Sequence, residues 1–273
     1  MEKNMAENIA IFELSDVTYD YGNNGHALDS VDLIINKGDS VSLLGANGSG
    51  KSTLLKLLDG LYFPLSGEIR AFGKIISESA MQNKKSSMNF HKKVGFVFQD
   101  PDTQLFLPTV WDEVAFAPLQ TGMPKNEVKE IVSDALNSLG LYNLRDRAPY
   151  HLSEGEKKKV SIASILTLDP EVWLMDEPSA SLDPRTKGWV IDFILGLAES
   201  GKTTIIATHD LEIPYVATKY CHVLGQDHKI LARGTGEEIL NNEEILLKAN
   251  LIHKHRHVHN GVAHVHPHKH WHF

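Results

Sequence analysis

The residues most able to do chemistry lie in one glycine-rich stretch that follows a short apolar segment. Residues 40–44, SVSLL, are typical of a strand, and residues 45–53 read GANGSGKST. This is the G-x-x-x-x-G-K-[ST] pattern in its strand-to-helix setting, where backbone N–H groups converge on phosphate oxygens at a helix start. The sequence therefore predicts a phosphate-binding loop. The less specific interpretation is a glycine-rich turn that only joins a strand to a helix.

Each part of this loop has an expected contact with a bound triphosphate. Lys51 would reach the β- and γ-phosphates, and the Ser52 hydroxyl would ligate Mg²⁺. The glycines allow backbone angles that are closed to other residues, so successive N–H groups can point at one anion. The predicted nucleotide contacts in the loop are Gly45, Ala46, Asn47, Gly48, Ser49, Gly50, Lys51, Ser52 and Thr53.

Two carboxylates follow a second apolar segment, VWLMDE at residues 172–177. Such a strand is buried along its length and presents Asp176 and Glu177 at its carboxyl end, where open α/β sheets bind ligands. We expect Asp176 to hold the Mg²⁺ shell and Glu177 to polarise the attacking water as a general base. A solvated acidic pair at a strand end is the simpler interpretation.

Two further polar residues also end predicted strands. His209 follows the strand at 203–208 and is expected to contact the γ-phosphate, although a lone histidine is often structural. Gln99 follows the strand at 94–98, and its amide is expected to contact Mg²⁺ or the lytic water. Taken alone, Gln99 is an ordinary polar residue.

The segment LSEGE at residues 152–156 permits two interpretations that do not exclude each other. Ser153 followed by Glu156 is a capping box, which fixes the start of a helix. A helix N-terminus with Gly155 beside it is also an anion site. Because it lies in a different part of the chain from the phosphate loop, Ser153 and Gly155 are predicted to serve the nucleotide of another subunit.

The elements that must position these residues alternate between strands and helices. Periodicity predicts strands over 9–19, 28–35, 68–72, 94–98, 172–175 and 203–208, and helices over 52–59, 125–139, from 153 onward and over 184–199. Strand, helix and strand in succession predict a parallel sheet. Residues 77–93 are expected to form a polar loop with one helical turn, and residues 99–168 a mainly helical lobe.

From residue 9 to about residue 250 the chain resembles an ATP-binding cassette ATPase. The matching motifs are the Walker A at 45–53, the Q-loop at Gln99, the signature at 152–156, the Walker B at 172–177, the D-loop at 179–183, the switch histidine at His209 and the adenine-stacking aromatic at Tyr21. The resemblance implies an α/β fold, with a P-loop NTPase (RecA-like) core around a parallel sheet, a small N-terminal antiparallel β layer and an inserted helical subdomain at about 99–168. It implies a cassette over 8–250 and a separate tail over 251–273.

In that family ATP lies between the Walker A of one subunit and the signature of the other, so a second ATPase subunit is implied, most simply in a homodimer. The D-loop residue Asp183 is then a further nucleotide contact. The usual signature is LSGGQ, whereas Glu154 and Glu156 stand here in place of a glycine and the glutamine. Two carboxylates should repel a γ-phosphate unless they point away or are neutralised by the lysines at 157–159.

Composition limits the partners. The 273 residues carry a net charge of −8, so no nucleic-acid partner is expected. Cys221 is the only cysteine, which excludes an internal disulfide and suits a reducing compartment, most simply as a small buried hydrophobe. No stretch of eighteen apolar residues occurs, so a cytoplasmic chain is expected that reaches a membrane only through integral membrane subunits.

Residues 97–106, VFQDPDTQLF, with PTV at 108–110 and EVAF at 113–116, resemble the energy-coupling-factor importers, particularly the cobalt and nickel branch. In such importers this region forms the groove that receives a helix of the transmembrane partner. Phe106, Trp111 and Phe116 would then supply apolar contact area. The alternative is that these aromatic side chains belong to the core of the helical lobe.

The tail provides an independent indication of metal chemistry. Its nine histidines fall mostly at alternate positions: His253, His255, His257, His259, His264, His266, His268, His270 and His272. Imidazole binds Ni²⁺ and Co²⁺, and an extended chain places alternate side chains on one side. The alternatives are an expression tag or a polar tail without a bound metal.

Together these features predict an ATP hydrolase that uses Mg²⁺ and drives import of cobalt or nickel ions at the cytoplasmic face of a membrane. Three alternatives remain at this point. The chain could serve the import of another micronutrient, such as a vitamin, could store or carry metal ions with an incidental nucleotide fold, or could be a non-transport cassette ATPase. The long coiled-coil insert or tandem cassettes usual in that last class are absent from the sequence.

Overall fold

A computed structural model describes residues 9–22, 25–259 and 262–268, and the last two strands only as backbone. The strands are β1 (Ala10–Asp20), β2 (His26–Asn36), β3 (Ser40–Leu44), β4 (Ser66–Ala71), β5 (Lys74–Ile75), β6 (Val94–Val97), β7 (Val172–Asp176), β8 (Thr203–Thr208), β9 (Tyr220–Leu224), β10 (Ile230–Gly234), β11 (His253–His259) and β12 (Val262–His268). The α-helices are α1 (Lys51–Leu58), α2 (Glu78–Gln82), α3 (Lys84–His91), α4 (Val110–Gln120), α5 (Lys125–Ser138), α6 (Glu154–Leu166), α7 (Pro184–Glu199), α8 (Glu212–Val216), α9 (Gly236–Leu240) and α10 (Glu243–Lys248).

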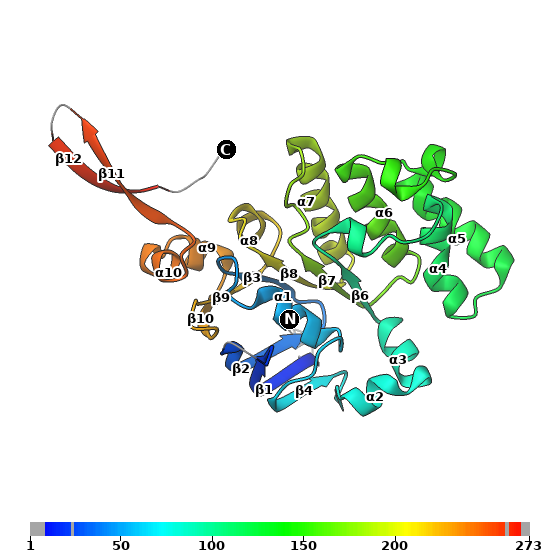
Figure 1. Ribbon diagram of the computed structural model, residues 1–273, viewed down its shortest axis with the longest axis horizontal. Coiled ribbons are helices and arrows are strands. Elements are labelled where there is room, and N and C mark those ends of the chain that lie inside the picture. The colour runs from blue at the N-terminus through cyan, green and yellow to red at the C-terminus, as the bar shows by residue number, and fades with distance from the viewer. Residues whose placement is uncertain (1–8, 23–24, 260–261, 269–273) are drawn as a thin grey trace, which may run out of the picture.

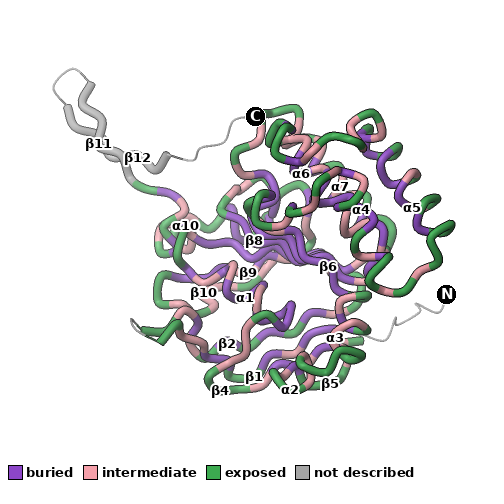
Figure 2. Tube along the Cα trace, turned by 45° about the vertical axis from the view of Figure 1, so that its right-hand side comes forward, coloured by how far each residue is buried: buried purple, intermediate pink, exposed green. Residues whose placement is uncertain are grey.

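The central sheet has the strand order β10-β9-β3-β8-β7-β6. Its strands pair in parallel from β9 to β6, and β10 joins the edge antiparallel to β9. Every residue of β3, β6, β7 and β8 is buried, as Figure 2 shows along the middle of the molecule. Strands covered on both faces need continuous apolar runs, which explains SVSLL and VWLMD. Because the strands are parallel, their carboxyl ends present Leu44, Asp176 and Thr208 at one edge.

A second sheet, antiparallel with the order β2-β1-β4-β5, forms a separate layer (Figure 1). Helix α1 contacts both β2 and the central strands β7 and β8, so it lies between the two layers. Its four leucines are fully buried, and each contributes about 1.5–3 kcal/mol by leaving water. This packing fixes the helix whose first turn carries Lys51 and Ser52.

Helices α4, α5 and α6 form the helical lobe beside the sheet, and their apolar faces share one core with α7 and the inner face of β7 (Figure 1). The structure confirms the predicted α/β architecture, with its parallel sheet, antiparallel layer and helices. Cys221 is fully buried in a strand, as expected.

One prediction of local structure was wrong. Residues 77–93 contain two short helices, α2 and α3, instead of a loop with one turn. Ser77 and Asn83 each accept a hydrogen bond from a backbone N–H three residues later, so two caps begin two helices in quick succession. Among the described residues, no helix combines the length and apolar character needed to cross a bilayer.

Candidate nucleotide-binding site

The predicted phosphate loop leads from β3 into α1. Gly50 occupies the N-cap of α1 with φ +104°, and no side chain caps the helix there. A Cβ on Gly50 would lie 2.3 Å from the carbonyl oxygen of Ala27, so only glycine fits at this close approach to β2. The uncapped N–H groups of the first turn are therefore left to face an anion.

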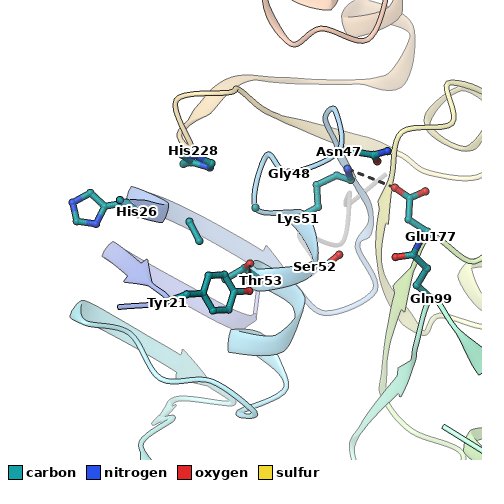
Figure 3. A pocket seen from close by; sticks show the side chains of 13 residues that line it. Tyr21, His26, Asn47, Gly48, Lys51, Ser52, Thr53, Gln99, Glu177 and His228 are labelled. Carbon is teal, nitrogen blue, oxygen red and sulfur yellow. Dashed lines mark hydrogen bonds and ion pairs between the residues drawn. The ribbon is translucent and has the colours of Figure 1, made fainter. Parts of the chain in front are cut away.

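Lys51 is buried and directed back over this loop. Its Nζ donates to the carbonyl oxygens of Gly45 at 2.7 Å and Ala46 at 3.1 Å, and lies 3.5 Å from Glu177 Oε1. Burial lowers the pKa of the Lys51 ammonium, and the nearby Glu177 carboxylate opposes that shift. The ammonium group therefore sits at the centre of the loop, where a β- or γ-phosphate would take over its contacts (Figure 3).

Ser52 and Asp176 bring oxygen atoms together beside the loop. Ser52 Oγ donates to Asp176 Oδ1 at 2.8 Å. Gln99 lines the cavity next to Ser52 and Lys51 and presents its amide there. Burial raises the pKa of Asp176, and the hydrogen bond from Ser52 offsets only part of that rise. A hydroxyl, a carboxylate and an amide are hard oxygen donors of the kind that Mg²⁺ prefers alongside phosphate oxygens. The residues present thus fit Mg²⁺, which would neutralise phosphate charge when bound.

Glu177 follows β7 in a strained conformation. Its φ is +42°, which is uncommon for a residue other than glycine and typical of functional sites. His209 Nδ1 lies 2.9 Å from Glu177 Oε2. Burial would raise the pKa of Glu177, but the hydrogen bond and charge of His209, with Lys51, outweigh it and lower the pKa. The Glu177 hydrogen bond in turn raises the pKa of His209. An ionised carboxylate is therefore held ready to accept a proton.

A cavity of about 720 Å³ is lined by Lys51, Ser52, Gln99 and Glu177 among others. Its lining residues are Tyr21, Gly25, His26, Ala27, Asn47, Gly48, Gly50, Lys51, Ser52, Thr53, Gln99, Glu177 and His228. The structure brings together predicted residues from four separate segments, at Tyr21, at 47–53, at Gln99 and at Glu177, as Figure 3 shows. Tyr21 lies at the far end from Glu177, is 58% exposed, and shares a 2.8 Å hydrogen bond between its hydroxyl and Thr53 Oγ1.

Several predicted residues act differently from the rest. Gly45 and Ala46 contribute carbonyl groups to Lys51 and do not line the cavity, and buried Ser49 does not line it either. His209 lines a neighbouring cavity, which shares Glu177 with the first. The sequence interpretation missed His26 and His228, since each is brought to the cavity by strand pairing and no local motif marks it.

The predicted signature residues form a second site. Ser153, Gly155 and Asp183 line a cavity of about 340 Å³ that has no lining residue in common with the cavity around Lys51. A Cβ on Gly155 would lie 2.9 Å from Thr186 Oγ1, so glycine lets the start of α6 approach α7. Asp183 caps α7, and its carboxylate accepts from the backbone N–H groups of Arg185 and Thr186.

The two signature carboxylates are accounted for within the chain. Glu156 completes the predicted capping box, since Ser153 donates to Glu156 Oε2 through both its N–H and its hydroxyl at 2.8 Å. Glu154 Oε1 lies 3.2 Å from Lys157 Nζ, which also contacts Asp102. Lys157 therefore neutralises Glu154, which is one of the two ways in which the sequence analysis expected repulsion of a phosphate to be avoided.

Comparison with known proteins decides the family. The sequence pattern of the ABC transporter family matches residues 28–180, more than half of the chain. This chain belongs to the ABC transporter family. It is 49% identical over 242 residues, 89% of this chain and 99% of the relative, to a protein of Caldanaerobacter subterraneus subsp. tengcongensis provisionally assigned as an ABC transporter ATP-binding protein.

Two further comparisons give a named relative and a solved structure of similar fold. It is 43% identical to the nickel import ATP-binding protein NikO of Rhodobacter capsulatus, over 88% of this chain and 95% of NikO. Its fold matches cbiO1 of Clostridium perfringens, part of the ABC transporter complex cbiONQ, with a TM-score of 0.75, 33% identity, and coverage of 89% of this chain and 95% of that one. The cassette is an ATP-binding and ATP-hydrolysing subunit of an ABC transporter.

One residue of the cassette that the sequence did not single out for this role connects the two sites. Lys158 is 1% exposed and lies one turn into α6, after the signature. Its Nζ donates to the carbonyl oxygens of Phe98 at 3.0 Å and Gln99 at 2.8 Å, and burial lowers its pKa to about 8. Lys159 lies instead over the Trp189 ring, so neither of these lysines pairs with the signature carboxylates.

The aromatic residues after Gln99 divide between surface and core. Phe106 and Phe116 are 67% and 38% exposed, and their rings meet edge to face with centroids 5.3 Å apart. Trp111 packs against the core of the helical lobe, which matches the alternative expectation for that residue. In the tail, the described backbone of β11 and β12 pairs as an antiparallel ladder, whereas His270 and His272 lie outside the described residues.

Proposed function

We propose that this cassette works as one of a pair of identical ATPase subunits, bound to integral membrane subunits at the cytoplasmic face of the membrane, and drives energy-coupling-factor import of cobalt or nickel ions. The observation that carries the proposal is the separation of the two sites. The cavity around Lys51 has the groups for binding a triphosphate and activating water, and the signature residues belong to another cavity.

A pair of subunits explains why both sites exist. The Ser153 hydroxyl and the first N–H groups of α6 form a phosphate-contacting surface that this chain's own nucleotide does not use. A two-fold symmetric pair places each signature against the other subunit's phosphate loop, since such an interface uses the same surface of both chains. ATP bound between them would hold the pair closed, and hydrolysis beside Glu177 would release it.

The exposed aromatic pair supports contact with a membrane partner. Phe106 and Phe116 are large apolar side chains on the surface, close in sequence to Gln99, and Leu119 is 45% exposed on the same helix as Phe116. Exposed aromatic clusters of this kind are typical of protein interfaces. Closure of the ATPase pair would then move the partner through the segment that begins at Gln99.

The ion is proposed from two observations. The segment at 97–116 resembles the cobalt and nickel branch of the importers, and the relative from Rhodobacter capsulatus is named for nickel import. Import of a vitamin by the same machinery is the competing possibility. Uptake of Ni²⁺, Co²⁺ and vitamins by cells that express the complete complex would separate these substrates.

The direct test of the motor is Mg²⁺-dependent ATPase activity of the purified chain with its membrane subunits. Glu177→Gln keeps the size of the side chain but removes the base, so hydrolysis should fall about 10²–10⁴-fold while ATP still binds. Isolation of the chain from native membranes should recover integral subunits. Full activity of the variant would refute the role of Glu177, and recovery of no membrane subunit would refute the transport assignment.

We also propose that the tail binds Ni²⁺ or Co²⁺. The backbone register pairs His253 with His268, His255 with His266 and His257 with His264. Residues directly opposite each other in an antiparallel pair share a face, so these six histidines fall on one face of the ladder. Neutral imidazole is the nitrogen ligand that both ions prefer.

Calorimetry with Ni²⁺ and Co²⁺ tests the tail. The full chain should bind either ion, and a full-length variant with all nine tail histidines replaced by asparagine should not. Affinity should fall below about pH 6, because protonated imidazole cannot coordinate a metal. Mg²⁺ is the control and should give the same heats with both proteins. Equal Ni²⁺ and Co²⁺ heats in the two proteins would refute a metal-binding tail.

A further inference from the structure

His228 is an unusual residue in the turn between β9 and β10. Its φ is +62°, in the left-handed region that glycine adopts without penalty and that few other residues adopt, histidine among them more often than most. Backbone strain of this kind persists where the surroundings enforce it, and it is concentrated at ligand sites. The His228 ring lines the cavity around Lys51, and its Nδ1 is buried without a hydrogen-bond partner among the described residues.

The surroundings hold the turn firmly against the nucleotide cavity. The His228 carbonyl oxygen accepts from the Asp29 N–H at 3.0 Å, and the adjacent Lys229 Nζ lies 3.1 Å from Asp29 Oδ2. These two contacts fasten the turn to β2. Strand β9 pairs directly with β3, the strand that leads into the phosphate loop. The turn that contains His228 follows β9, so it begins next to that strand.

His26 reaches the same end of the cavity from the start of β2, opposite Asp20 in the register with β1. Figure 3 shows Tyr21, His26 and His228 around one end, with Lys51, Glu177 and Gln99 at the other. Because the phosphates lie at the Lys51 end, a bound nucleotide must direct its ribose and base toward the three rings.

We propose that His228, assisted by His26, contacts the ribose and base of the bound nucleotide on the side opposite Tyr21. The imidazole rings supply flat, partly apolar surfaces against which a ribose or purine packs. This inference deepens the ATP-binding role and rests on it.

The test compares ATP with inorganic tripolyphosphate, which lacks the ribose and base that the proposal places against His228. His228→Gly removes the ring and also relieves the backbone, so loss of folding cannot explain a loss of binding. Calorimetry should show ATP affinity reduced about three- to tenfold, because the contact of one aromatic ring is lost. Affinity for inorganic tripolyphosphate, which has neither ribose nor base, should stay within twofold of wild type, and the melting temperature should not fall.

Gln226→Gly is the matched control, since Gln226 is exposed in the same turn and does not line the cavity. It should leave both affinities unchanged. His26→Ala should weaken ATP binding less than His228→Gly does, because His26 is exposed. Unchanged ATP affinity in His228→Gly, or an equal loss for ATP and tripolyphosphate, would overturn the proposal. Failure of the wild-type chain to bind either ligand would instead refute the nucleotide site itself.

Discussion

The phosphate half of the molecule and its signature half differ in how far their side chains are buried and in what holds them. In the phosphate half, defined by Lys51, Ser52, Asp176 and Glu177, three of the four side chains are 5% exposed and each contacts another member of the set. In the signature half, defined by Ser153, Gly155 and Asp183, the two side chains are exposed and are held only by local helix caps.

This difference separates the two roles. A buried set of mutually bonded groups is positioned before any ligand arrives, which is what catalysis needs. An exposed set at two helix starts has its geometry fixed, and under the proposed function the phosphate loop of a second subunit completes it. The largest loss of activity outside the phosphate half should therefore come from the signature surface.

Removing the Ser153 hydroxyl tests that surface. Ser153→Ala should lower turnover about 10²-fold, because the hydroxyl, which donates to Glu156 here, is no longer available to donate to the transferring phosphoryl group of the partner's nucleotide. Binding of ATP to the separate chain should not change, since Ser153 does not line the cavity around Lys51. Ser153→Thr, which keeps both the hydroxyl and the cap, is the control and should stay active. Weakened ATP binding by the separate chain would show that the two halves are not separate.

Lys158 links the two halves, since it lies on the helix that begins with the signature and donates to the backbone at Gln99. Its removal therefore tests how far the halves depend on each other. Lys158→Met leaves the carbonyl groups of Phe98 and Gln99 without their buried donor, at a cost of about 1–3 kcal/mol in the free energy of unfolding. Turnover should fall about tenfold, which corresponds to about 1.4 kcal/mol in the activation free energy, because the backbone at Gln99 loses the donor that holds it.

The control is Lys159→Met, on the same helix but over the Trp189 ring. Lys159→Met should have little effect on the free energy of unfolding or on turnover. A calorimetric melt and a steady-state ATPase assay measure both effects. Equal behaviour of the two variants would remove Lys158 from the account.

The signature carboxylate Glu154 should have a smaller effect. Its charge is already paired with Lys157, and the pair is partly exposed, so neutralising it changes the local field little. Glu154→Gln and Glu154→Gly should leave nucleotide binding intact and change turnover by less than about threefold. A change of tenfold or more in an ATPase titration would place Glu154 in contact with the partner's nucleotide.

Asp59 tests the stability of the phosphate half alone. It follows α1, is 5% exposed, and its Oδ1 has no hydrogen-bond partner among the described residues. Burial raises the pKa of Asp59 well above the usual value. The partly exposed His91, whose Nε2 lies 3.8 Å from Asp59 Oδ2, does not offset this rise. The folded chain thus binds a proton that the unfolded chain releases.

The sign of the pH dependence follows. The stability that the protonated Asp59 contributes is present below about pH 4, the ordinary pKa of aspartate, and is lost as pH rises through the raised folded value. Asp59→Asn should remove this loss and raise the melting temperature at pH 8 by about 2–5 °C, with a smaller gain at pH 5. Equal shifts at both pH values would show that Asp59 does not titrate in this range.

The sequence predicts best what is local. The phosphate loop needs one strand, three glycines and one helix start, all within fifteen residues, and the structure places them as expected. The pairing of Ser52 with Asp176 was also predictable, because parallel strands end at one edge. The two helices at 77–93 were missed because their apolar residues are too few to show a helical period.

What depends on long-range pairing was hidden. His228 reaches the cavity only because β9 pairs with β3 and the following turn is fastened to Asp29, nearly 200 residues earlier in the chain. The sequence singled out Lys158 only as one of three lysines that could neutralise the signature carboxylates, and its burial follows from how α6 packs against β6. Neither fact leaves a periodic or motif signal in the sequence.

The central claim, that each catalytic site is divided between two copies of this chain, has one direct measurement. Lys51→Met and Ser153→Ala each damage both sites of a pure pair. In a pair made of one of each, the two lesions meet in one site and leave the other intact. Random mixing makes half of all pairs mixed, so ATPase activity should return to about a quarter of wild type. Lys51→Met mixed with wild type measures the activity of a pair with one intact site. No gain in activity on mixing, where that control retains it, would contradict the account.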